Sequence, residues 1–486
     1  MHAAATPPTA PNIILLVADD LGFGDLSIAG SARVRTPQLD RLGRNGSRFQ
    51  RFSVASPVCS PSRAGLLTGQ WPARHGIHGA FGSSAACNKD GMPLWLDPGA
   101  VLLPRLLHSA GYATALYGKW HLSVNDARGP MPQEYGFDDY RGFNGPPDAA
   151  TASAHEIFDL AAGFVAGRGA KPAFVVVAAH EPHIPHQPSA GALERFAHLS
   201  KETERVYAAA VADFDDGVGR LVDGLRRHGE WENTLLLFFS DNGPEHSSPD
   251  ARDGVHRVCT GNPARPGSNA STGQLYLVAQ KTCVVRCGEG CSLGQTAGLR
   301  GRKRSLFEGG VASPLLVSWP AGGVPRGHSD ATSVLNAVDL LPTLCRLAGV
   351  ALPAGYLPDG EDVAAALLRG RPSKRRRSLL WEYQGFVHTQ HTKDGWPWLA
   401  VREGDWKLVL SGDRQRKELF DLSNDRAEKT DLAAANGHAH AEVVARLERD
   451  VLAWQMGLHP GRLGNRTLLS RLRGSTLVHG LTSDNA

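Results

Sequence analysis

Long apolar runs recur along the chain, and each is closed by polar residues. The clearest are residues 12–18 (NIILLVA) and residues 234–240 (TLLLFFS). Uninterrupted runs of Leu, Ile, Val and Phe of this length are typical of strands buried on both faces, as in the centre of a parallel sheet. Two shorter runs, at residues 113–117 and 174–179, have the same character. The sequence therefore predicts an α/β fold built on a large mixed, mostly parallel sheet.

Apolar positions at helical spacing lie between these runs. Residues 201–228 repeat apolar side chains such as Val211 and Phe214 every three to four positions, which predicts a long amphipathic helix. We also expect helices at residues 104–112 and 334–347. Helices that alternate with strands would flank the sheet on its faces.

The spacing of the apolar runs changes after the basic, proline-containing stretch 370–377. Short strand-like runs then follow one another closely, and Gly404-Asp405 is typical of a hairpin turn. We expect strands at 378–383, 398–402, 406–410 and 418–422, and then a helix at 439–455. This pattern predicts a smaller C-terminal antiparallel sheet plus helix. The predicted organisation is a catalytic α/β domain at 11–372, a C-terminal α+β subdomain at 378–460 and a tail at 461–486.

The length and charge of the chain narrow its class. With 486 residues it is too long for one ordinary core, so two domains are expected. The net charge of +4 gives no indication of nucleic-acid binding but suits an anionic substrate. No apolar run is long enough to span a bilayer. The N-terminus lacks the basic and apolar regions of a signal peptide. We therefore expect a cytoplasmic protein, or a secretory, lysosomal or periplasmic one if a leader precedes this sequence.

Acidic and amide side chains follow the two central strands directly. Asp19 and Asp20 come after the first strand, and Asp241 and Asn242 come after the second. Each pair alone is equally consistent with a solvated turn. However, ligands bind at the carboxyl ends of strands in open α/β sheets, and adjacent carboxylates repel one another unless a cation lies between them. Four oxygen ligands at one sheet edge therefore predict a site for Ca²⁺ or Mg²⁺.

One short segment combines a thiol, a proline and an arginine. It runs from Cys59 to Gly69 as CSPSRAGLLTG, and Pro61 suits the first turn of a helix. A cysteine at a helix start lies at the positive end of the helix dipole, and Arg63 adds a full charge. The segment is therefore a candidate thiolate nucleophile or anion site. The alternative is a buried free cysteine at the start of a helix.

Lysines and histidines follow other strands. Lys119 and His121 are two residues apart, so an extended backbone would place them on one face. The alternative is a surface lysine beside a packed histidine. The proline-rich loop 180–186 (HEPHIPH) contains three histidines, as some zinc sites do, and Lys303 lies in a basic cluster that alone would indicate a solvated surface.

Together these segments resemble the signature motifs of type I sulfatases, a formylglycine-dependent, arylsulfatase-like family of the alkaline phosphatase superfamily. The Cys59 segment matches C-x-P-S-R-A-x-x-L-T-G, and GKWHL and PHIP match two further motifs. Residues 299–310 (LRGRKRSLFEGG) resemble L-R-G-x-K-x-S-x-x-E-G-G. Two positions depart from the family: Ser123 replaces a glycine, and the arginine that usually follows the last motif is absent. The resemblance covers residues 11–455 apart from an insert and implies an alkaline phosphatase-like fold.

The resemblance also implies the nucleophile and its cation. In this family the cysteine at the position of Cys59 is oxidised to formylglycine by a formylglycine-generating enzyme. One hydroxyl of its hydrate attacks the sulfur of a sulfate ester, and the other lets the group collapse to the aldehyde and expel sulfate. The cation, usually Ca²⁺ with Mg²⁺ as the alternative, polarises a sulfate oxygen. The resemblance assigns its ligands to Asp19, Asp20, Asp241 and Asn242, with the group made from Cys59 beside them.

Five further side chains receive catalytic roles from the same resemblance. Arg63 stabilises the formylglycine side chain, and Lys119 and Lys303 hold sulfate oxygens. His183 protonates the departing alcohol, and His121 accepts the proton whose removal releases sulfate. His180 and His186 receive no such role and are interpreted as loop or substrate-rim residues.

An insert at residues 246–297 separates two of the motifs. It is rich in Gly, Ser, Asn and Pro, and it carries Cys259, Cys283, Cys287 and Cys291, the last three spaced C-x3-C-x3-C. We expect an irregular loop without a metal. A small metal or disulfide knot and translated non-coding sequence are the alternatives, since a long structureless insert is uncommon inside a compact domain.

The sequence therefore predicts a sulfuric ester hydrolase that acts on sulfate monoesters of carbohydrates or aryl alcohols. Two alternatives stay open. One is a phosphonate or phosphate monoester hydrolase of the same superfamily, since the tetrahedral anions differ little in shape. The other is a catalytically inactive binder of sulfated glycans, which would result if Cys59 is not oxidised. The expected partners are a sulfated small molecule or glycan and the formylglycine-generating enzyme, with no nucleic acid and no membrane span.

Overall fold

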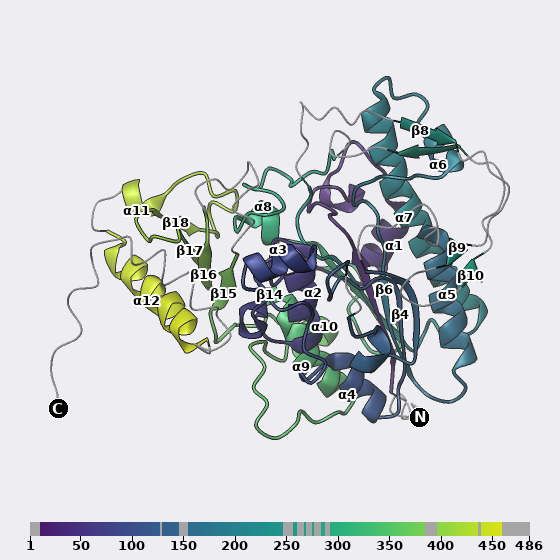
Figure 1. Cartoon of the computed structure of the whole chain (residues 1–486), viewed down its shortest axis with the longest axis horizontal. Helices are drawn as coiled ribbons and strands as arrows, with labels where there is room; N and C mark the ends of the chain where they lie inside the picture. Colours follow the sequence, from purple (N-terminus) through teal and green to yellow (C-terminus); the bar gives the residue numbers. More distant parts are fainter. Residues whose placement is uncertain are drawn as a thin grey trace, which may run out of the picture.

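One eight-stranded sheet organises the larger part of the protein (Figure 1). The computed structural model describes residues 10–126, 129–144, 154–245, 256–259, 267–268, 275–276, 283–286, 292–383, 396–435 and 439–458. The strand order is β13-β2-β12-β7-β1-β6-β4-β5. These strands are β1 (Asn12–Ala18), β2 (Ser47–Phe49), β4 (Ala113–Lys119), β5 (Asp139–Phe143), β6 (Ala173–Ala178), β7 (Thr234–Ser240), β12 (Leu315–Ser318) and β13 (His328–Asp330).

Strand β1 lies at the centre of this sheet. It runs parallel to β6 on one side and to β7 on the other, and every residue of β1 and β7 is buried. Strands covered on both faces need no polar alternation, which explains their continuous apolar sequence. β12 pairs antiparallel with β7 and with β2. The predicted mixed, mostly parallel sheet is confirmed.

Different helices cover the two faces of the sheet. Ile14 and Leu16 of β1 pack in a core with α1, α5 and α7, whereas Ile13 and Leu15 pack in a core with α2, α4 and α9. This division follows from the two-residue period of a strand, which sends successive side chains to opposite faces. The covering helices are α1 (Pro37–Asn45), α2 (Cys59–Thr68), α4 (Leu103–Ser109), α5 (Ala154–Gly167), α7 (Glu202–Arg227) and α9 (Leu340–Leu347).

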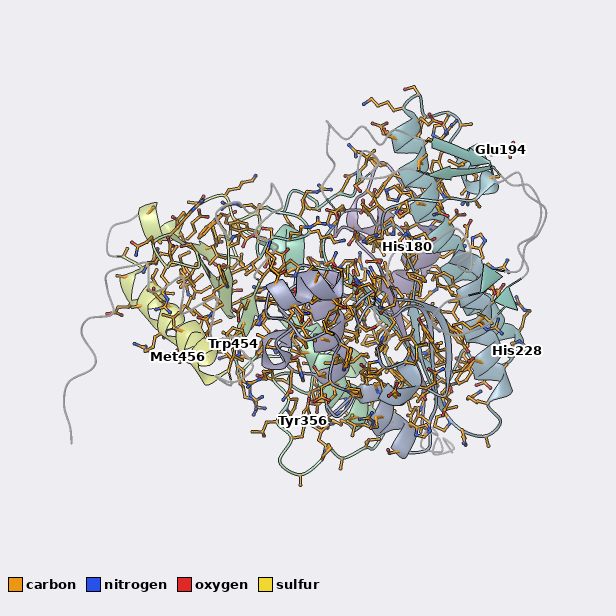
Figure 2. The ribbon with its side chains drawn as sticks, viewed as in Figure 1. His180, Glu194, His228, Tyr356, Trp454 and Met456 are labelled. Carbon is orange, nitrogen blue, oxygen red and sulfur yellow. The ribbon has the colours of Figure 1, made fainter. Side chains whose placement is uncertain are left out.

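A smaller four-stranded antiparallel sheet forms the C-terminal part, in the order β15-β16-β17-β18. One face packs against α12 through Leu447 and Val451. Figure 2 labels Trp454 and Met456 on this outer helix. The elements are β15 (Leu379–Glu382), β16 (Leu399–Glu403), β17 (Trp406–Leu410), β18 (Lys417–Asp421) and α12 (Ala441–Gly457). The predicted C-terminal antiparallel sheet plus helix is confirmed.

The other face of the small sheet packs on the larger part through one shared apolar core. Val58 and Phe307 from the larger part contact Trp381 and Phe420 from the small sheet within it. The Trp381 ring lies 6.1 Å from the Trp71 ring, and its Nε1–H donates to the Val54 carbonyl over 2.8 Å. The small sheet therefore supports the segment that leads directly into α2.

Short elements connect these layers. They are the 3₁₀ turns η1 (Ser27–Ala29), η2 (Pro72–His75), η3 (Pro132–Tyr135) and η5 (Ala337–Asp339), the strands β3 (Phe52–Ser53) and β14 (Leu335–Asn336), and the helices α3 (Ser84–Lys89), α6 (Ala190–Arg195), α8 (Glu308–Val311), α10 (Ala364–Arg369) and α11 (Leu432–Ala435). Among the described residues, no helix combines the length and the apolar character needed to cross a membrane.

Two sequence-based expectations were wrong in detail. The helix expected at 334–347 begins later, at Leu340, because Leu335 and Asn336 pair with β3 and Asn336 then accepts a hydrogen bond from the Val338 N–H. The insert is not wholly irregular. It contains the antiparallel pairs β8 (His256–Cys259) with β11 (Cys283–Arg286) and β9 (Gly267–Ser268) with β10 (Leu275–Tyr276). Residues 292–297 of the insert are also described, whereas its remaining residues and the tail at 461–486 lie outside the described part of the chain.

Candidate active site

The acids that follow β1 and β7 meet because these strands are parallel neighbours. Ala18 and Ser240, at the ends of the two strands, are partners in register. Just beyond these ends, the Asp20 N–H donates to Asp241 Oδ1 over 3.4 Å. Asp20 has a φ of 66°, a left-handed conformation that aspartate tolerates better than most residues. Both carboxylates are buried, so the sheet edge carries a concentrated negative charge.

Cys59 is the first residue of α2 and faces these acids. Its Sγ lies 3.6 Å from Asp19 Oδ1, and the side chain is buried. Burial raises the pKa of the Cys59 thiol to about 12, although Lys119 and Lys303 act in the opposite direction. The unmodified side chain is therefore a neutral thiol at neutral pH. The thiolate that the helix start suggested is not favoured.

Arg63 links Cys59's helix to two other elements. Its Nε and Nη2 donate to Asp241 Oδ2 over 3.0 and 2.7 Å. Its Nη1 donates to the Lys119 carbonyl over 2.9 Å. A guanidinium held by three hydrogen bonds has little freedom, so Arg63 fixes the ends of β7 and β4 relative to Cys59.

Two buried lysines lie against the same group of acids. Lys119, the last residue of β4, has its Nζ 2.6 Å from Asp19 Oδ2. Lys303, which comes from the loop before α8, has its Nζ 2.6 Å from Asp20 Oδ2. They are 2 % and 4 % exposed. The end of β4 and the loop before α8 thus bring two ammonium groups to the buried acids near Cys59.

His183 lies over the same carboxylates. Its Nε2 is 3.5 Å from Asp20 Oδ2, and its Nδ1 contacts the Ile184 carbonyl. Burial, followed by the charge of Lys303, holds the pKa of His183 well below its usual range. The imidazole is therefore neutral in this state, and an anion bound beside it would favour its protonation.

His121 adopts a different backbone from the one expected. Its φ is 51°, so Lys119 and His121 do not share the face of an extended strand. His121 Nε2 lies 2.9 Å from the Phe81 carbonyl, while Nδ1 is buried without a hydrogen-bond partner among the described residues. Burial and the charge of Lys119 hold the pKa of His121 well below its usual range. Nδ1 is thus free to accept a proton.

The donor set fits a hard divalent cation. One potential ligand atom from each of Asp19, Asp20, Cys59 and His183 lies within 4.8 Å of the others. Asn242 donates through Nδ2 to Asp20 Oδ1 over 2.6 Å, but its Oδ1 is buried without a hydrogen-bond partner among the described residues. Carboxylate and amide oxygens are what Ca²⁺ and Mg²⁺ bind.

The charge balance of the site leads to the same conclusion. Burial, together with the neighbouring charge of Asp19, raises the pKa of Asp241 to about 7. Arg63 pairs with Asp241 and Lys119 with Asp19, yet the crowded carboxylates still disfavour one another's charge. A cation at this position would relieve the repulsion and release Lys119 and Lys303 from the acids.

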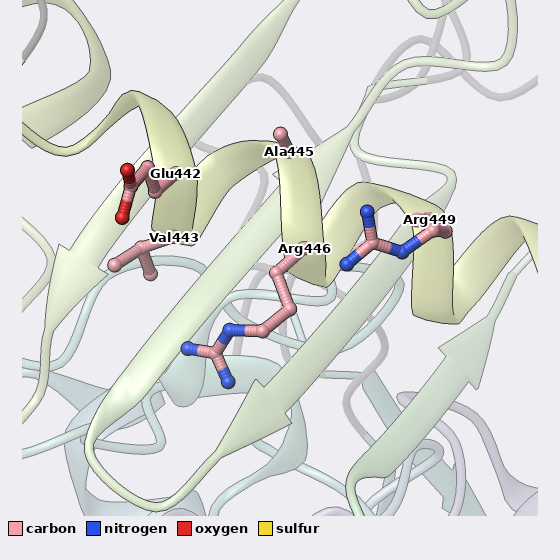
Figure 3. A pocket seen from close by; sticks show the side chains of 5 residues that line it. All are labelled: Glu442, Val443, Ala445, Arg446 and Arg449. Carbon is pink, nitrogen blue, oxygen red and sulfur yellow. The ribbon is translucent and has the colours of Figure 1, made fainter.

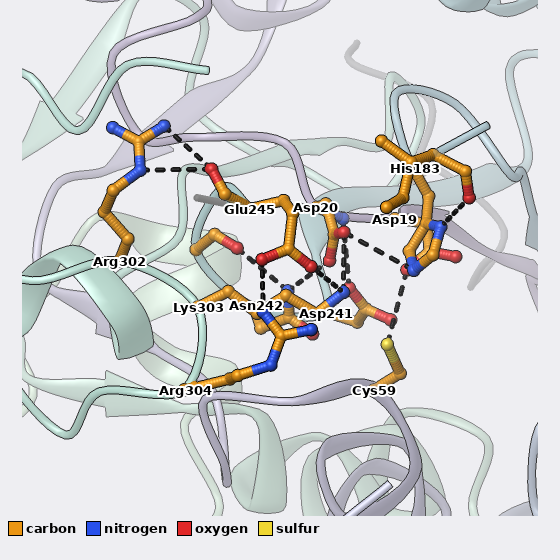
Figure 4. A network of polar contacts seen from close by, with 12 residues as sticks. Asp19, Asp20, Cys59, His183, Asp241, Asn242, Glu245, Arg302, Lys303 and Arg304 are labelled. Carbon is orange, nitrogen blue, oxygen red and sulfur yellow. Dashed lines mark hydrogen bonds and ion pairs between the residues drawn. The ribbon is translucent and has the colours of Figure 1, made fainter. Parts of the chain in front are cut away.

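Glu245 is a member of the site that the sequence reasoning missed (Figure 4). One carboxylate oxygen lies 3.4 Å from Lys303 Nζ, and the other contacts Arg304. Those charges hold the pKa of Glu245 near 2 in spite of burial, which alone would raise it. The only signal was its place three residues after Asn242, and this spacing has no chemical meaning without the fold.

The two other histidines of the loop pack around the site and do not join the acids. The His180 ring lies 5.2 Å from the His183 ring and 5.8 Å from the Phe143 ring. The His186 ring lies 5.6 Å from the Tyr207 ring. This agrees with their interpretation as loop residues. Neither histidine belongs to the group of potential metal ligands around Cys59.

Other polar groups lie away from this site. A shallow hollow on α12 is lined by Glu442, Val443, Ala445, Arg446 and Arg449 (Figure 3), and it carries no group suited to catalysis. His155, Asp213 and Asp216 form a second acidic cluster. There, however, the Ser189 hydroxyl donates a hydrogen bond to Asp213, and Arg195 forms an ion pair with Asp216. The described chemistry-bearing residues thus converge on the carboxyl ends of β1 and β7.

Known proteins similar to this chain fall into one group. The sequence pattern described as Sulfatase matches residues 11–350, and that of N-sulphoglucosamine sulphohydrolase, C-terminal, matches residues 301–456. Steryl-sulfatase of Mus musculus is 32 % identical over 444 residues, which cover 78 % of this chain and 68 % of that protein. Arylsulfatase A of Homo sapiens is 29 % identical over 521 residues, which cover 98 % and 86 % respectively.

A solved structure extends the likeness to the whole fold. Ps i-CgsB, determined in complex with k-i-k-neocarrahexaose, is 25 % identical to this chain and superposes with a TM-score of 0.74. The match covers 96 % of this chain and 98 % of that one. Both sheets described above therefore have counterparts in that protein.

Proposed function

The chain belongs to the sulfatase family of the alkaline phosphatase superfamily and is a sulfatase, and we propose that it cleaves sulfate monoesters with a formylglycine made from Cys59 and a Ca²⁺ ion. The observation that carries this proposal is the position of Cys59. Its Sγ lies 3.6 Å from Asp19 Oδ1, at the start of a helix and beside two buried lysines. A neutral buried thiol is a poor nucleophile at this position. A side chain converted to an aldehyde would form a hydrate whose hydroxyl can attack sulfur.

The acids would hold the cation. Asp19, Asp20, Asp241 and Asn242 would supply the oxygen ligands. Asp19 and Asp20 form a close cluster with Cys59, and the Asn242 side-chain oxygen is buried without a hydrogen-bond partner among the described residues. The cation would polarise a sulfate oxygen and lower the cost of negative charge on the nucleophile. The formylglycine hydrate would supply one hydroxyl for attack on sulfur and a second through which sulfate can leave.

The two lysines would bind the sulfate group. With the carboxylates engaged by a cation, Lys119 and Lys303 can turn their ammonium groups to the substrate oxygens. Once turned, they would be donors held at fixed backbone positions where charge develops on those oxygens. Arg63 would hold α2 in place against the ends of β7 and β4 during the reaction.

The histidines would move the protons. His183 lies on the side of Asp20 next to Lys303, and a bound sulfate ester would raise its pKa so that it can protonate the departing alcohol. His121 has Nδ1 without a hydrogen-bond partner among the described residues. It would accept the proton whose removal allows sulfate to be released.

A sulfated carbohydrate is the proposed substrate class, with aryl sulfates as surrogates. Two likenesses support this choice. Ps i-CgsB, at 25 % identity, was determined with a neocarrahexaose. N-acetylgalactosamine-6-sulfatase of Sus scrofa is 31 % identical to this chain over 408 residues. The partner required for maturation would be a formylglycine-generating enzyme.

The test is turnover of an aryl sulfate by protein co-expressed with a formylglycine-generating enzyme. Aryl phosphate and aryl phosphonate are assayed beside it, because they report the alternative chemistry of the superfamily. Cys59→Ala removes the nucleophile, and Cys87→Ala removes a buried free cysteine outside the site as a matched control. We expect sulfate turnover that Cys59→Ala abolishes and Cys87→Ala retains. Higher turnover of phosphate or phosphonate, or activity in Cys59→Ala, would contradict the proposal.

A further inference from the structure

A cluster of fully buried charges lies where the small C-terminal sheet meets the larger part of the protein. Lys407, on β17, has its Nζ 2.9 Å from Glu308 Oε1 and 3.0 Å from Glu428 Oε1. Arg402 on β16 adds a second cation, 3.9 Å from Glu308 Oε2. Lys407 and Glu428 are 0 % exposed and Glu308 is 2 % exposed. Charges are rarely placed this deep unless their partners are held in a fixed geometry.

Glu308 and Glu428 depend on Lys407 for their arrangement. The two glutamates are also joined directly, because the Glu308 N–H donates to Glu428 Oε2 over 2.6 Å. Their charges repel, and burial raises the pKa of Glu428 to about 7. Lys407 is the ammonium group that contacts both. Without it, one carboxylate would have to protonate or move away.

Glu308 belongs to the segment that carries Lys303. Within this segment, residues 300–311, the Gly309 N–H donates to the Arg300 carbonyl over 2.6 Å. Arg300 itself donates to Glu418 Oε2 over 2.6 Å and to the Glu428 carbonyl over 3.3 Å. Both ends of the loop that presents Lys303 are therefore tied to the C-terminal sheet and its following turn.

The same segment touches both halves of the active site. The Lys303 N–H donates to the Pro244 carbonyl over 3.0 Å, next to the cation ligands Asp241 and Asn242. The Arg304 N–H donates to the Pro57 carbonyl over 3.0 Å, two residues before Cys59. A shift of this segment would change the distance from Lys303 to the nucleophile and to the cation together.

We propose that Lys407 is a positioning residue of the active site, which acts from the C-terminal sheet by holding Glu308 and Glu428 and, through them, the loop that presents Lys303. The small sheet is thus a structural part of the catalytic centre although it supplies none of the groups assigned there. This inference rests on the proposed sulfatase chemistry. Lys407 would thus fix the position of the small sheet relative to the active-site edge of the large sheet.

The test compares three variants of the full chain that has been matured with formylglycine. Lys407→Met keeps the length of the side chain and removes its charge. Lys407→Met/Glu428→Gln also removes one of the two repelling carboxylates and keeps an acceptor for the Glu308 N–H. Lys417→Met is the matched control, because Lys417 on β18 pairs with Glu448 within the same subdomain at 2.8 Å, partly exposed.

The measurements are kcat and KM for an aryl sulfate, the dissociation constant for inorganic sulfate, and the melting temperature. We expect Lys407→Met to lose about tenfold or more in kcat/KM, since a displacement near 1 Å can cost on the order of 100-fold. Its affinity for sulfate should fall as well. The double variant should recover most of both losses, and Lys417→Met should change neither.

Each other outcome has a definite meaning. A lower melting temperature for Lys407→Met with unchanged kcat/KM and sulfate affinity would reduce Lys407 to a stabilising role and overturn the inference. If Lys407→Met does not fold, Glu308→Gln tests the same link, and unchanged kcat/KM there would also overturn it. Absence of turnover in the unsubstituted protein would count against the proposed function, while sulfate affinity would still report on the positioning.

Discussion

Asn242 donates its side-chain N–H to Asp20 Oδ1 over 2.6 Å, while its own side-chain oxygen is buried without a hydrogen-bond partner among the described residues. A buried amide oxygen without a partner is costly, and this one belongs to a side chain that bonds one of the clustered carboxylates. The relationship supports the proposal that Asn242 is a ligand of the cation. It also explains why an amide suits this position, since a fourth carboxylate would add charge and could not donate to Asp20.

We therefore expect Asn242→Ala to weaken Ca²⁺ binding by at least about tenfold. Calorimetric titration of Ca²⁺ into protein that retains the Cys59 thiol measures this without reference to activity. Asn424→Ala, which removes a surface amide that bonds Asp421, serves as the control. Equal Ca²⁺ affinity in all three proteins would show that the amide oxygen is not a ligand.

Lys119→Met should lower kcat/KM for an aryl sulfate by on the order of 100-fold or more, because one preorganised donor to the developing charge is lost. The side chain is 2 % exposed and lies 2.6 Å from Asp19 Oδ2, so the methionine fills the same space. Steady-state kinetics measures the effect. Lys171→Met, at an exposed position, should leave both parameters unchanged, and a loss below about threefold at Lys119 would contradict its role.

Gly243→Ala should damage both stability and activity. A Cβ at Gly243 would lie 1.9 Å from the Gly309 carbonyl oxygen, so the turn after Asn242 would be forced away from the Lys303 segment. Gly163→Ala is the matched control, because nothing lies within 4 Å of its added Cβ on α5. Alanine there should raise the free energy of unfolding by about 0.5–1 kcal/mol. Denaturant unfolding and kinetics check both variants, and a fully active Gly243→Ala would be inconsistent with this packing.

Asp215 should make stability depend on pH. Its carboxylate accepts the N–H groups of Gln38 and Leu39 at the start of α1, yet burial raises its pKa to about 7. The folded state thus binds the proton more tightly than the unfolded state. The resulting stabilisation is complete below the unfolded pKa, near 4, and is lost as pH rises through about 7, by up to about 1.4 kcal/mol per pH unit.

Urea unfolding of the unsubstituted protein and of Asp215→Asn at pH 5 and at pH 7.5 tests this prediction. Asp215→Asn should lower the free energy of unfolding by about 1–3 kcal/mol at both pH values, because one backbone N–H loses its acceptor. The substitution should also reduce the fall in the free energy of unfolding between pH 5 and pH 7.5. An equal decline in both proteins would assign the pH dependence to other groups.

The parts of the fold that follow from short-range sequence were predictable. The buried strands β1 and β7 are apolar between their end residues. Their neighbourhood in a parallel sheet brings Asp20 and Asp241 together, as the sequence predicted. The fold class is confirmed. The catalytic roles of Cys59, Lys119 and His183 stay predictions, although the structure brings these side chains to one place.

Other features depend on contacts that no local pattern records. The contacts of Glu245 with Lys303 and of Glu308 with Lys407 join residues more than 50 positions apart. The positive φ of His121 broke the simple strand periodicity on which its placement relied. The helix at 334–347 began late because a two-residue pairing with β3 outweighed the helical pattern. In each case tertiary contacts decided what composition and spacing left open.

The central claim is that formylglycine at position 59 carries out the reaction. The most direct measurement pairs two numbers from the same preparation: the fraction of the tryptic peptide of residues 52–63 that carries an aldehyde in place of the Cys59 thiol, and the rate of aryl sulfate turnover per molecule. Preparations with different degrees of conversion supply the range. We expect turnover to rise in proportion to aldehyde content and to vanish in protein that retains the thiol. Turnover that is independent of aldehyde content would contradict it.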